Sequence, residues 1–228
     1  MRLLEPINQK QLFGLEKYFN EFVKLDLNKR FPNKILLSGN KGIGKSTLAF
    51  HYINYVLSKD EDFKYDKINF KIDSNNHSFK ITLNKTNPNF YLIDVNSEKK
   101  MIDINQIREL IINLSKSSFN KKPRFILIDN IEYLNINSIN ALLKIIEEPP
   151  KNVFFFLINN NKKIKATLKS RCIEYKISIS NNEVISIANK ILNIDSLEMI
   201  NEDLINYYIT PGKIYDLIKF SENNSIDL

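Results

Sequence analysis

The stretch GNKGIGKST, residues 39–47, has the residue types and spacing that hold a phosphate chain, because it fits the pattern G-x-x-x-x-G-K-[ST]. Its glycines let the backbone wrap so that N–H groups point at phosphate oxygens, and a following helix N-terminus adds a favourable dipole. Lys45 is placed to reach the β- and γ-phosphates, and the Ser46 hydroxyl to ligate magnesium. A vestigial loop that binds nothing is the alternative. The predicted nucleotide and Mg²⁺ site comprises Gly39, Gly42, Gly44, Lys45, Ser46 and Thr47.

A second chemical group, the Asp129 carboxylate, follows the apolar run FILI. A buried parallel strand delivers such a carboxylate to its C-terminal edge, where it can complete the shell of a magnesium ion. ATP-hydrolysing machines of this design usually place a glutamate next, to polarise the attacking water, and here the next residue is Asn130. An amide orients a water molecule without accepting its proton. On a continuing strand Glu132 would face the side opposite to Asp129, so we expect it to be a poor substitute.

Alternating strands and helices are predicted to position these groups. Together they predict an α/β fold, with a parallel sheet and helices on both faces. The proline pair in EEPP ends one helix at Glu147, since proline cannot continue it. The polar stretch 58–89 is predicted to be a surface insertion. Strands are expected at 34–39, 90–94, 124–129 and 153–158, and helices at Gln9–Leu25, Ser46–Leu57, Ile104–Leu114 and Ser138–Glu147.

Strand signals stop after Tyr175, and three short helical patterns follow, at 182–192, 196–209 and 212–220. We therefore predict two domains. Residues 1–176 form the nucleotide-binding domain, and residues 177–228 form a small three-helix domain.

Composition excludes several classes of protein. The 228 residues are 43% hydrophobic and 26% charged, which is typical of a soluble globular chain. No apolar run approaches the roughly 20 residues of a membrane span, so no membrane partner is expected. The single cysteine, Cys172, fits a reducing cytoplasm. The net charge of +7 leaves direct DNA contact open, although the lysines are scattered along the chain.

One succession of motifs distinguishes among the many classes of P-loop protein: NALLKIIEEPP (140–150), then FFFLINN (154–160), then TLKSRC (167–172). It resembles the clamp-loader branch of the AAA+ ATPases, most closely the delta-prime subunits of the bacterial DNA polymerase III holoenzyme. The resemblance covers nearly the whole chain, and TPGKIYDLI (210–218) resembles the turn of that family's helical lid domain.

The resemblance implies a role in a ring that uses ATP to open a sliding clamp and close it around primer–template DNA. The implied partners are the gamma/tau motor subunits and the delta subunit. The sliding clamp and DNA are then bound by the assembled complex. Arg171 of the SRC motif is then an arginine finger that acts in trans on a neighbour's ATP. Asn159 stands where the family places a polar residue that senses the γ-phosphate.

Departures from the family pattern suggest that nucleotide is held here and scarcely hydrolysed. Asn130 replaces the water-activating glutamate, and Gly212 stands where hydrolysing relatives have a phosphate-sensing arginine. No zinc is expected, because residues 58–89 contain no cysteine and only His77, which we expect to be a solvated loop residue. The family's third, collar domain would have to follow Leu228, so the chain is either a fragment or a shortened form.

Two other functions stay open at this stage. The first is a motor subunit that hydrolyses ATP itself, which Asn130 and Gly212 disfavour. The second is another P-loop enzyme such as a nucleotide kinase, which would leave the motifs at 140–172 without explanation.

Overall fold

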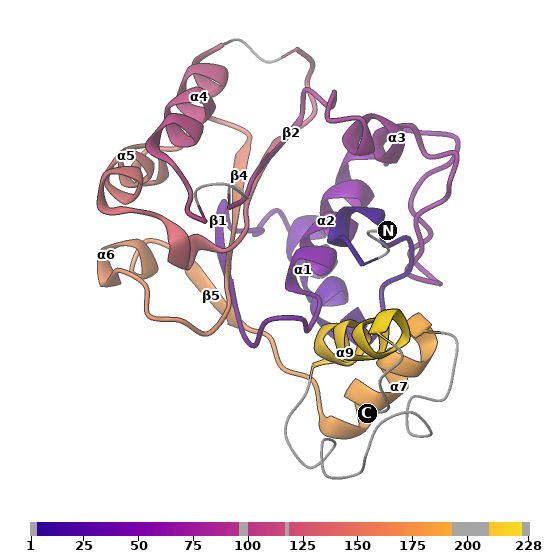
Figure 1. Ribbon diagram of the computed structural model, residues 1–228. Helices are drawn as coiled ribbons and strands as arrows, with labels where there is room; N and C mark the ends of the chain where they lie inside the picture. Colours follow the sequence, from indigo (N-terminus) through magenta and orange to yellow (C-terminus); the bar gives the residue numbers. More distant parts are fainter. Residues whose placement is uncertain (1–3, 96–99, 117–118, 193–209, 225–228) are drawn as a thin grey trace.

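A five-stranded parallel sheet lies between two layers of helices in the computed structural model, which describes residues 4–95, 100–116, 119–192 and 210–224 (Figure 1). The strand order is β2-β3-β4-β1-β5. The predicted α/β class is therefore confirmed. The strands are β1 (Lys34–Ser38), β2 (Phe90–Ile93), β3 (Arg124–Ile128), β4 (Val153–Asn159) and β5 (Ile173–Lys176).

The central strands are apolar throughout because successive side chains point into two different cores. In β1, Ile35 and Leu37 join one core while Leu36 joins the other. In β4, Phe156 faces the first core and Phe155 the second. This alternation explains why apolar runs such as ILL in β1 and FFFLI in β4 have no polar side.

Each core has its own set of helices (Figure 1). The first core takes α1 (Glu16–Leu27), α2 (Lys45–Leu57) and α3 (His77–Leu83). The second takes α4 (Ile104–Ser115), α5 (Ile136–Glu147) and α6 (Ala166–Lys169). Two 3₁₀ turns, η1 (Pro6–Asn8) and η2 (Ile131–Tyr133), complete this part of the chain. Helix α5 ends at Glu147, as the following prolines predict.

The predicted helix Gln9–Leu25 begins too early, because the observed helix starts at Glu16. Gly14 takes a positive φ of 72°, a conformation that interrupts a helix. Leu12 and Leu15 are buried all the same, so their spacing imitates a helical face. The segment before Gly14 instead pairs with a distant loop, where the Leu12 N–H donates to the Phe70 carbonyl at 3.1 Å.

The prediction that residues 58–89 form a surface insertion is wrong. Tyr65, Ile72 and Phe79 of this stretch are buried in the first core, and the Tyr65 ring stacks on Phe19 with centroids 5.0 Å apart. The stretch also contains α3, whose first residue is the exposed His77. Because most of its residues are polar, the few apolar side chains that pack into the core are not apparent from the sequence.

A buried histidine ties this stretch to the rest of the fold. His51 of α2 is fully buried, with Nε2 at 3.1 Å from the Gln9 carbonyl and Nδ1 at 2.9 Å from the Tyr65 hydroxyl. Since a carbonyl only accepts, Nε2 carries the proton and Nδ1 accepts from Tyr65. Burial lowers the pKa of His51 to about 4, against the opposing effect of the Gln9 hydrogen bond, so the ring stays neutral.

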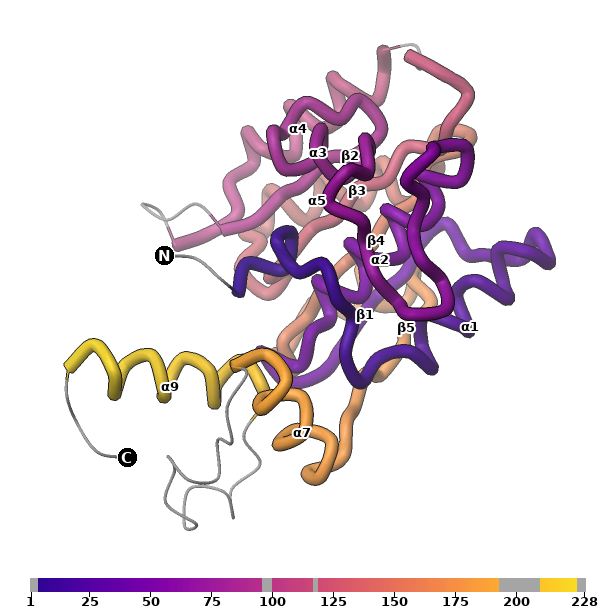
Figure 2. Tube along the Cα trace, turned by 90° about the vertical axis from the view of Figure 1, so that its right-hand side faces the viewer, coloured from indigo at the N-terminus to yellow at the C-terminus, as the bar shows by residue number. Residues whose placement is uncertain are grey.

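Beyond the predicted strands, β5 pairs with β1 at the edge of the sheet. Its sequence IEYK is half-exposed and polar, so it gives little hydrophobic signal. Helices α7 (Asn181–Leu192) and α9 (Pro211–Asn224) follow, and in both views they lie together at the end of the molecule opposite α4 (Figures 1 and 2). They match two of the three predicted helices. The third, at 196–209, lies outside the described residues, and the division at residue 176 stays a prediction.

Across residues 4–95, 100–116, 119–192 and 210–224, no helix combines the length and the apolar character that a membrane crossing needs.

Replacing Asn76 tests whether residues 58–89 are part of the core. The Asn76 side chain is fully buried, caps α3 through a 2.7 Å bond from the Phe79 N–H, and donates to the Phe63 carbonyl at 2.7 Å. We expect Asn76→Ala to lower the free energy of unfolding by about 2–3 kcal/mol, from a lost cap and stranded buried partners. Urea unfolding measures this loss. The control Asn75→Ala, at an exposed neighbour, should change it by less than about 0.5 kcal/mol. Equal effects of the two variants would contradict the assignment.

Candidate nucleotide-binding site

The glycine-rich loop runs from the end of β1 into α2, as the motif requires (Figure 1). Gly42 and Gly44 have positive φ angles of 89° and 91°, which favour glycine. Within the described structure no protein acceptor takes the backbone N–H groups of residues 41–47. These donors, together with the α2 N-terminus, make the loop fit the phosphates of a nucleotide.

Lys45 is nearly buried, with 3% of its surface exposed, and its ammonium is surrounded by oxygen atoms. Its Nζ donates to the Gly39 carbonyl at 2.9 Å, to the Asn40 carbonyl at 2.7 Å and to Asn160 Oδ1 at 3.0 Å. Desolvation lowers the pKa of Lys45 to about 8, although the nearby carboxylates of Asp129 and Glu132 favour its charged form. The ammonium is thus charged at neutral pH and lies at the centre of the loop.

Ser46 and Asp129, the two predicted magnesium ligands, are brought together. The Ser46 hydroxyl donates to Asp129 Oδ2 at 2.5 Å. The pKa of Asp129 is raised to about 6, chiefly by burial and also by the carboxylate of Asp94, although the bonds from Ser46 and from the Asn130 N–H oppose this rise. A hydroxyl beside a carboxylate is a donor set that suits Mg²⁺ held with a nucleotide's phosphates.

Asn130 is held as both a donor and an acceptor of hydrogen bonds. Its Nδ2 donates to Asp94 Oδ1 at 2.7 Å, and its Oδ1 accepts from Asn160 Nδ2 at 2.7 Å. Its φ of 56° turns the chain out of the sheet directly after β3. An amide performs both tasks, whereas a carboxylate could only accept.

The expected orientation of Glu132 is wrong, because it assumed that the strand continues. The chain instead turns into η2, and Glu132 faces the site. Its Oε1 accepts from Asn160 Nδ2 at 3.0 Å, and its charge acts on Lys45. A carboxylate therefore does lie near the loop, bound to an amide.

Of two neighbouring asparagines, Asn160 hydrogen-bonds Lys45 and Asn159 does not, so the γ-phosphate role of Asn159 stays a prediction. The Asn159 amide is buried and bonds within its own loop, donating to the Lys162 carbonyl at 3.0 Å. Asn160 instead joins Lys45, Asn130 and Glu132. The repeated asparagines of FFFLINNN gave no means of choosing between neighbours.

The turn before α9 closes directly on the loop. Thr210 Oγ1 donates to the Lys41 carbonyl at 2.7 Å, and the Gly212 N–H donates to the Gly42 carbonyl at 3.0 Å. A Cβ atom on Gly42 would lie 2.5 Å from Thr210 Oγ1, so only glycine allows this approach. Gly212 thus supplies a backbone contact, and no charge, at the phosphate loop.

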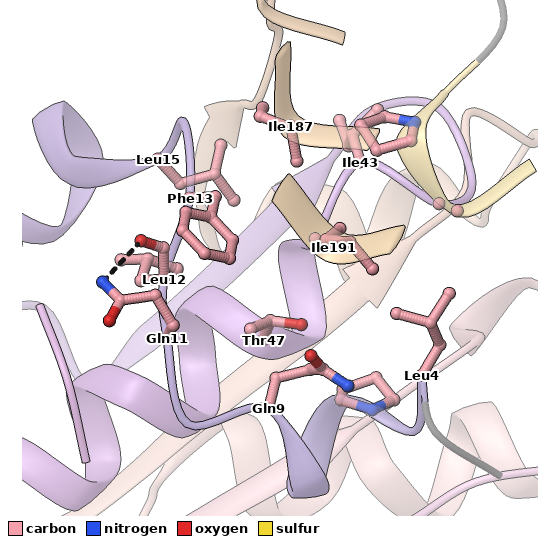
Figure 3. A pocket seen from close by; sticks show the side chains of 15 residues that line it. Leu4, Gln9, Gln11, Leu12, Phe13, Leu15, Ile43, Thr47, Ile187 and Ile191 are labelled. Atoms are coloured by element: carbon pink, nitrogen blue, oxygen red, sulfur yellow. Dashed lines mark hydrogen bonds between the residues drawn. The ribbon is translucent and has the colours of Figure 1, made fainter. Parts of the chain in front are cut away.

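An apolar cavity of about 130 Å³ opens beside the loop (Figure 3). Ile187 and Ile191 of α7 line it on one side and Leu12 and Phe13 on another, with Thr47 at the start of α2 (Figure 3). An apolar slot next to a phosphate cradle suits the base of a nucleotide. The sequence placed Leu12 and Phe13 in one predicted helix and Ile187 and Ile191 in another, and gave no sign that the two segments meet.

Arg171 shares no contact with Lys45, Ser46 or Asp129 in the described part of the chain. It follows α6, and its Nη2 lies 2.6 Å from Glu147 Oε1. The Arg171 side chain is 35% exposed. The Arg171 side chain therefore takes no part in the contacts of this chain's own phosphate loop.

Among the described residues, no three side chains of the His, Cys, Asp and Glu types are grouped to hold a metal ion. The absence of zinc stays a prediction.

Comparison with known proteins places the chain in a family. Residues 14–181 match the family model described as "DNA polymerase III, delta subunit". The chain belongs to the DNA polymerase III delta-subunit family. It is 30% identical over 166 residues to the delta' subunit of Buchnera aphidicola subsp. Schizaphis graminum, covering 72% of this chain and 48% of that protein. It is 28% identical over 225 residues to the gamma/tau subunit of Mycoplasma genitalium, covering 98% of this chain and 35% of that protein.

Solved structures agree on the fold. A gamma-subunit-related protein from Thermotoga maritima superposes with a TM-score of 0.52 at 19% identity, over 78% of this chain and 49% of that one. A RuvB variant from Thermotoga maritima gives 0.54 at 16% identity, over 98% of this chain and 69% of that one. The fold is that of P-loop AAA+ proteins. The chain spans about half the length, or less, of the delta' and gamma/tau relatives.

The acidity of Asp129 should appear in nucleotide binding. With a pKa of about 6, its carboxylate is mostly ionised at pH 7 and about nine-tenths protonated at pH 5. We expect affinity for a fluorescent ATP analogue with Mg²⁺ to fall about tenfold from pH 7 to pH 5, because a protonated carboxyl no longer supports the metal. Asp129→Asn should bind weakly at both pH values. Since protonation of the analogue itself affects both proteins, an equal pH ratio in wild type and variant would contradict the role of Asp129.

Proposed function

We propose that this chain is a non-motor clamp-loader subunit of the bacterial DNA polymerase III holoenzyme, acting in DNA replication in the cytoplasm. It holds ATP with Mg²⁺ without driving its hydrolysis, and it donates Arg171 to the ATP site of a neighbouring subunit. Its partners are the gamma/tau and delta subunits, with the sliding clamp and primer–template DNA met through the complex. Membership of the delta-subunit family and similarity to delta' subunits support this role.

The observation that carries the proposal is the fixed amide of Asn130. It stands where a hydrolysing subunit needs a carboxylate, and it is bound on both sides, to Asp94 and to Asn160. An amide has no basic pKa, so it cannot take a proton from the attacking water. Gly212 likewise brings no charge to the phosphates. Both departures leave the phosphate cradle intact.

In the proposed site, backbone N–H groups of residues 41–47 bind phosphate oxygens and the α2 dipole favours their charge. Lys45 neutralises the β- and γ-phosphates, while Ser46 and Asp129 support the metal. Magnesium supplies charge stabilisation along the phosphate chain when it is bound. The apolar cavity beside Thr47 receives the base.

Arg171 is suited to act in trans because it is partly exposed and remote from its own phosphate loop. A guanidinium is permanently charged, and its planar fork matches phosphate oxygens. Arginine fingers of this kind contribute about 10³–10⁵ to the rate of nucleotide hydrolysis.

The second candidate is a motor subunit that hydrolyses ATP itself. Its support is the similarity to the Mycoplasma genitalium gamma/tau subunit, which extends over 98% of this chain. Glu132, which faces the loop, is the carboxylate that such an activity would use. Turnover by the purified chain separates the two candidates.

We expect the isolated chain to hydrolyse ATP at well below about one turnover per second, because it lacks a free general base. A rate of several per second, abolished by Lys45→Ala, would instead establish the motor function. Steady-state phosphate release measures it.

Asn130→Glu should not restore turnover and should reduce stability, because the new carboxylate would face Asp94 and lose the donated bond. Pairing it with Asp94→Asn removes that repulsion. If the double variant is stable and still inactive, the missing base is not the only defect. Full activity of Asn130→Glu alone would contradict the structural reading of the amide.

Arg171→Ala should lower the ATPase rate of the reconstituted complex at least tenfold, a loss of about 1.4 kcal/mol in transition-state stabilisation. Nucleotide binding by this chain alone should stay unchanged. Arg171→Lys should rescue little, because an ammonium keeps the charge and loses the fork. Unchanged rates in the variant complex would refute the finger role.

A further inference from the structure

We propose that Glu147 is a positioning residue that presents Arg171 to the neighbouring subunit's nucleotide. This inference rests on the proposed function of Arg171 and extends it to the EEPP motif. Glu147, the last residue of α5, would then contribute to a reaction in the active site of another chain.

Three contacts fix the guanidinium of Arg171. Its Nε donates to Glu147 Oε1 at 2.8 Å, and its Nη2 approaches the same oxygen at 2.6 Å. On the other side its Nη1 donates to the Thr167 carbonyl at 2.8 Å. One carboxylate and one carbonyl therefore set both the direction and the plane of the group.

This arrangement leaves the outer end of the guanidinium available. Nη1 and Nη2 each carry two N–H bonds; Nη1 uses one on the Thr167 carbonyl, while Nη2 is ion-paired with Glu147 and commits at most one of its two to that side. One donor on each terminal nitrogen remains, within the described structure, to meet a bidentate acceptor such as two phosphate oxygens. A phosphate can therefore bind Arg171 without displacing Glu147.

The pair is built on packed elements. Helix α5 stops at Glu147 because prolines follow, which places this carboxylate at the helix end. Ile146 beside it and Leu168 of α6 are buried in the same core, so α5 and the turn that carries Arg171 are held in register. The EEPP and SRC motifs are thereby joined in one unit.

Two effects of the carboxylate oppose each other. Its negative charge weakens the attraction of Arg171 for phosphate, whereas its hydrogen bonds hold the arginine in one orientation. Both side chains are partly exposed, Arg171 at 35% and Glu147 at 49%, so water screens the charge effect. Orientation is the larger effect, because small misplacements of a catalytic group greatly reduce rates.

The test uses the complex of this chain with the gamma/tau and delta subunits of the same organism, assayed for steady-state ATPase with clamp and primed DNA. We expect Glu147→Ala to lower kcat about five- to tenfold with little change in KM, because a flexible arginine still leaves substrate binding intact. Glu147→Gln should keep most of the rate, since its amide oxygen still accepts the hydrogen bond from Arg171 Nε. Glu148→Ala, at the adjacent exposed position, should leave the rate unchanged.

A double variant separates positioning from general damage. In the Arg171→Ala background, Glu147→Ala should have no further effect on kcat, and complex assembly by gel filtration should match wild type. If Glu147→Ala leaves or raises the rate while Arg171→Ala lowers it, the positioning role is overturned and the finger role stands. If Arg171→Ala itself has no effect, the proposed function fails, and the inference fails with it. If Glu147→Ala impairs assembly, the isosteric Glu147→Gln decides: a loss as large as that of Arg171→Ala would overturn orientation by hydrogen bonds.

Discussion

A buried ammonium must be surrounded by oxygen atoms, and Lys45 imposes this requirement on the residues that follow two strands, β1 and β4. Carbonyls of the loop after β1 provide two of the oxygens, and Asn160 after β4 provides the third. Asn160 in turn donates to Asn130 after β3, so a chain of polar contacts crosses the sheet edge. The parallel order that places β1, β4 and β3 side by side is what makes this chain possible.

The same contacts explain why an amide replaces a carboxylate at position 130. Asn130 lies between an acceptor, Asp94, and a donor, Asn160, and only a side chain with both functions satisfies the two. Glu132 is likewise bound by Asn160. Polar groups that could do chemistry are thus used to hold the edge of the sheet together, which supports the proposal that nucleotide is bound here with little hydrolysis.

Local patterns predicted the parts of the fold that depend on neighbouring residues. The first four strands, the loop before α2 and the proline stop after Glu147 could be predicted, because each is determined by its own few residues. The extended segment before Gly14 and the core contacts of Tyr65 were not, since each depends on pairing with a distant stretch. Which asparagine contacts Lys45 depends on how the chain turns after β4. Three consecutive asparagines do not show whether Asn159 or Asn160 makes this contact.

The contact between the α9 turn and the phosphate loop has a thermodynamic consequence. Thr210 and Gly212 donate hydrogen bonds to the carbonyls of Lys41 and Gly42, so the position of α9 and the conformation of the loop form one linked equilibrium. Linkage is reciprocal: if nucleotide favours the docked lid by some factor, the docked lid favours nucleotide by the same factor. A neighbouring subunit that pulled α7 and α9 away would therefore loosen a ligand it never touches, and the affinity of this chain for nucleotide would report how its neighbours are arranged.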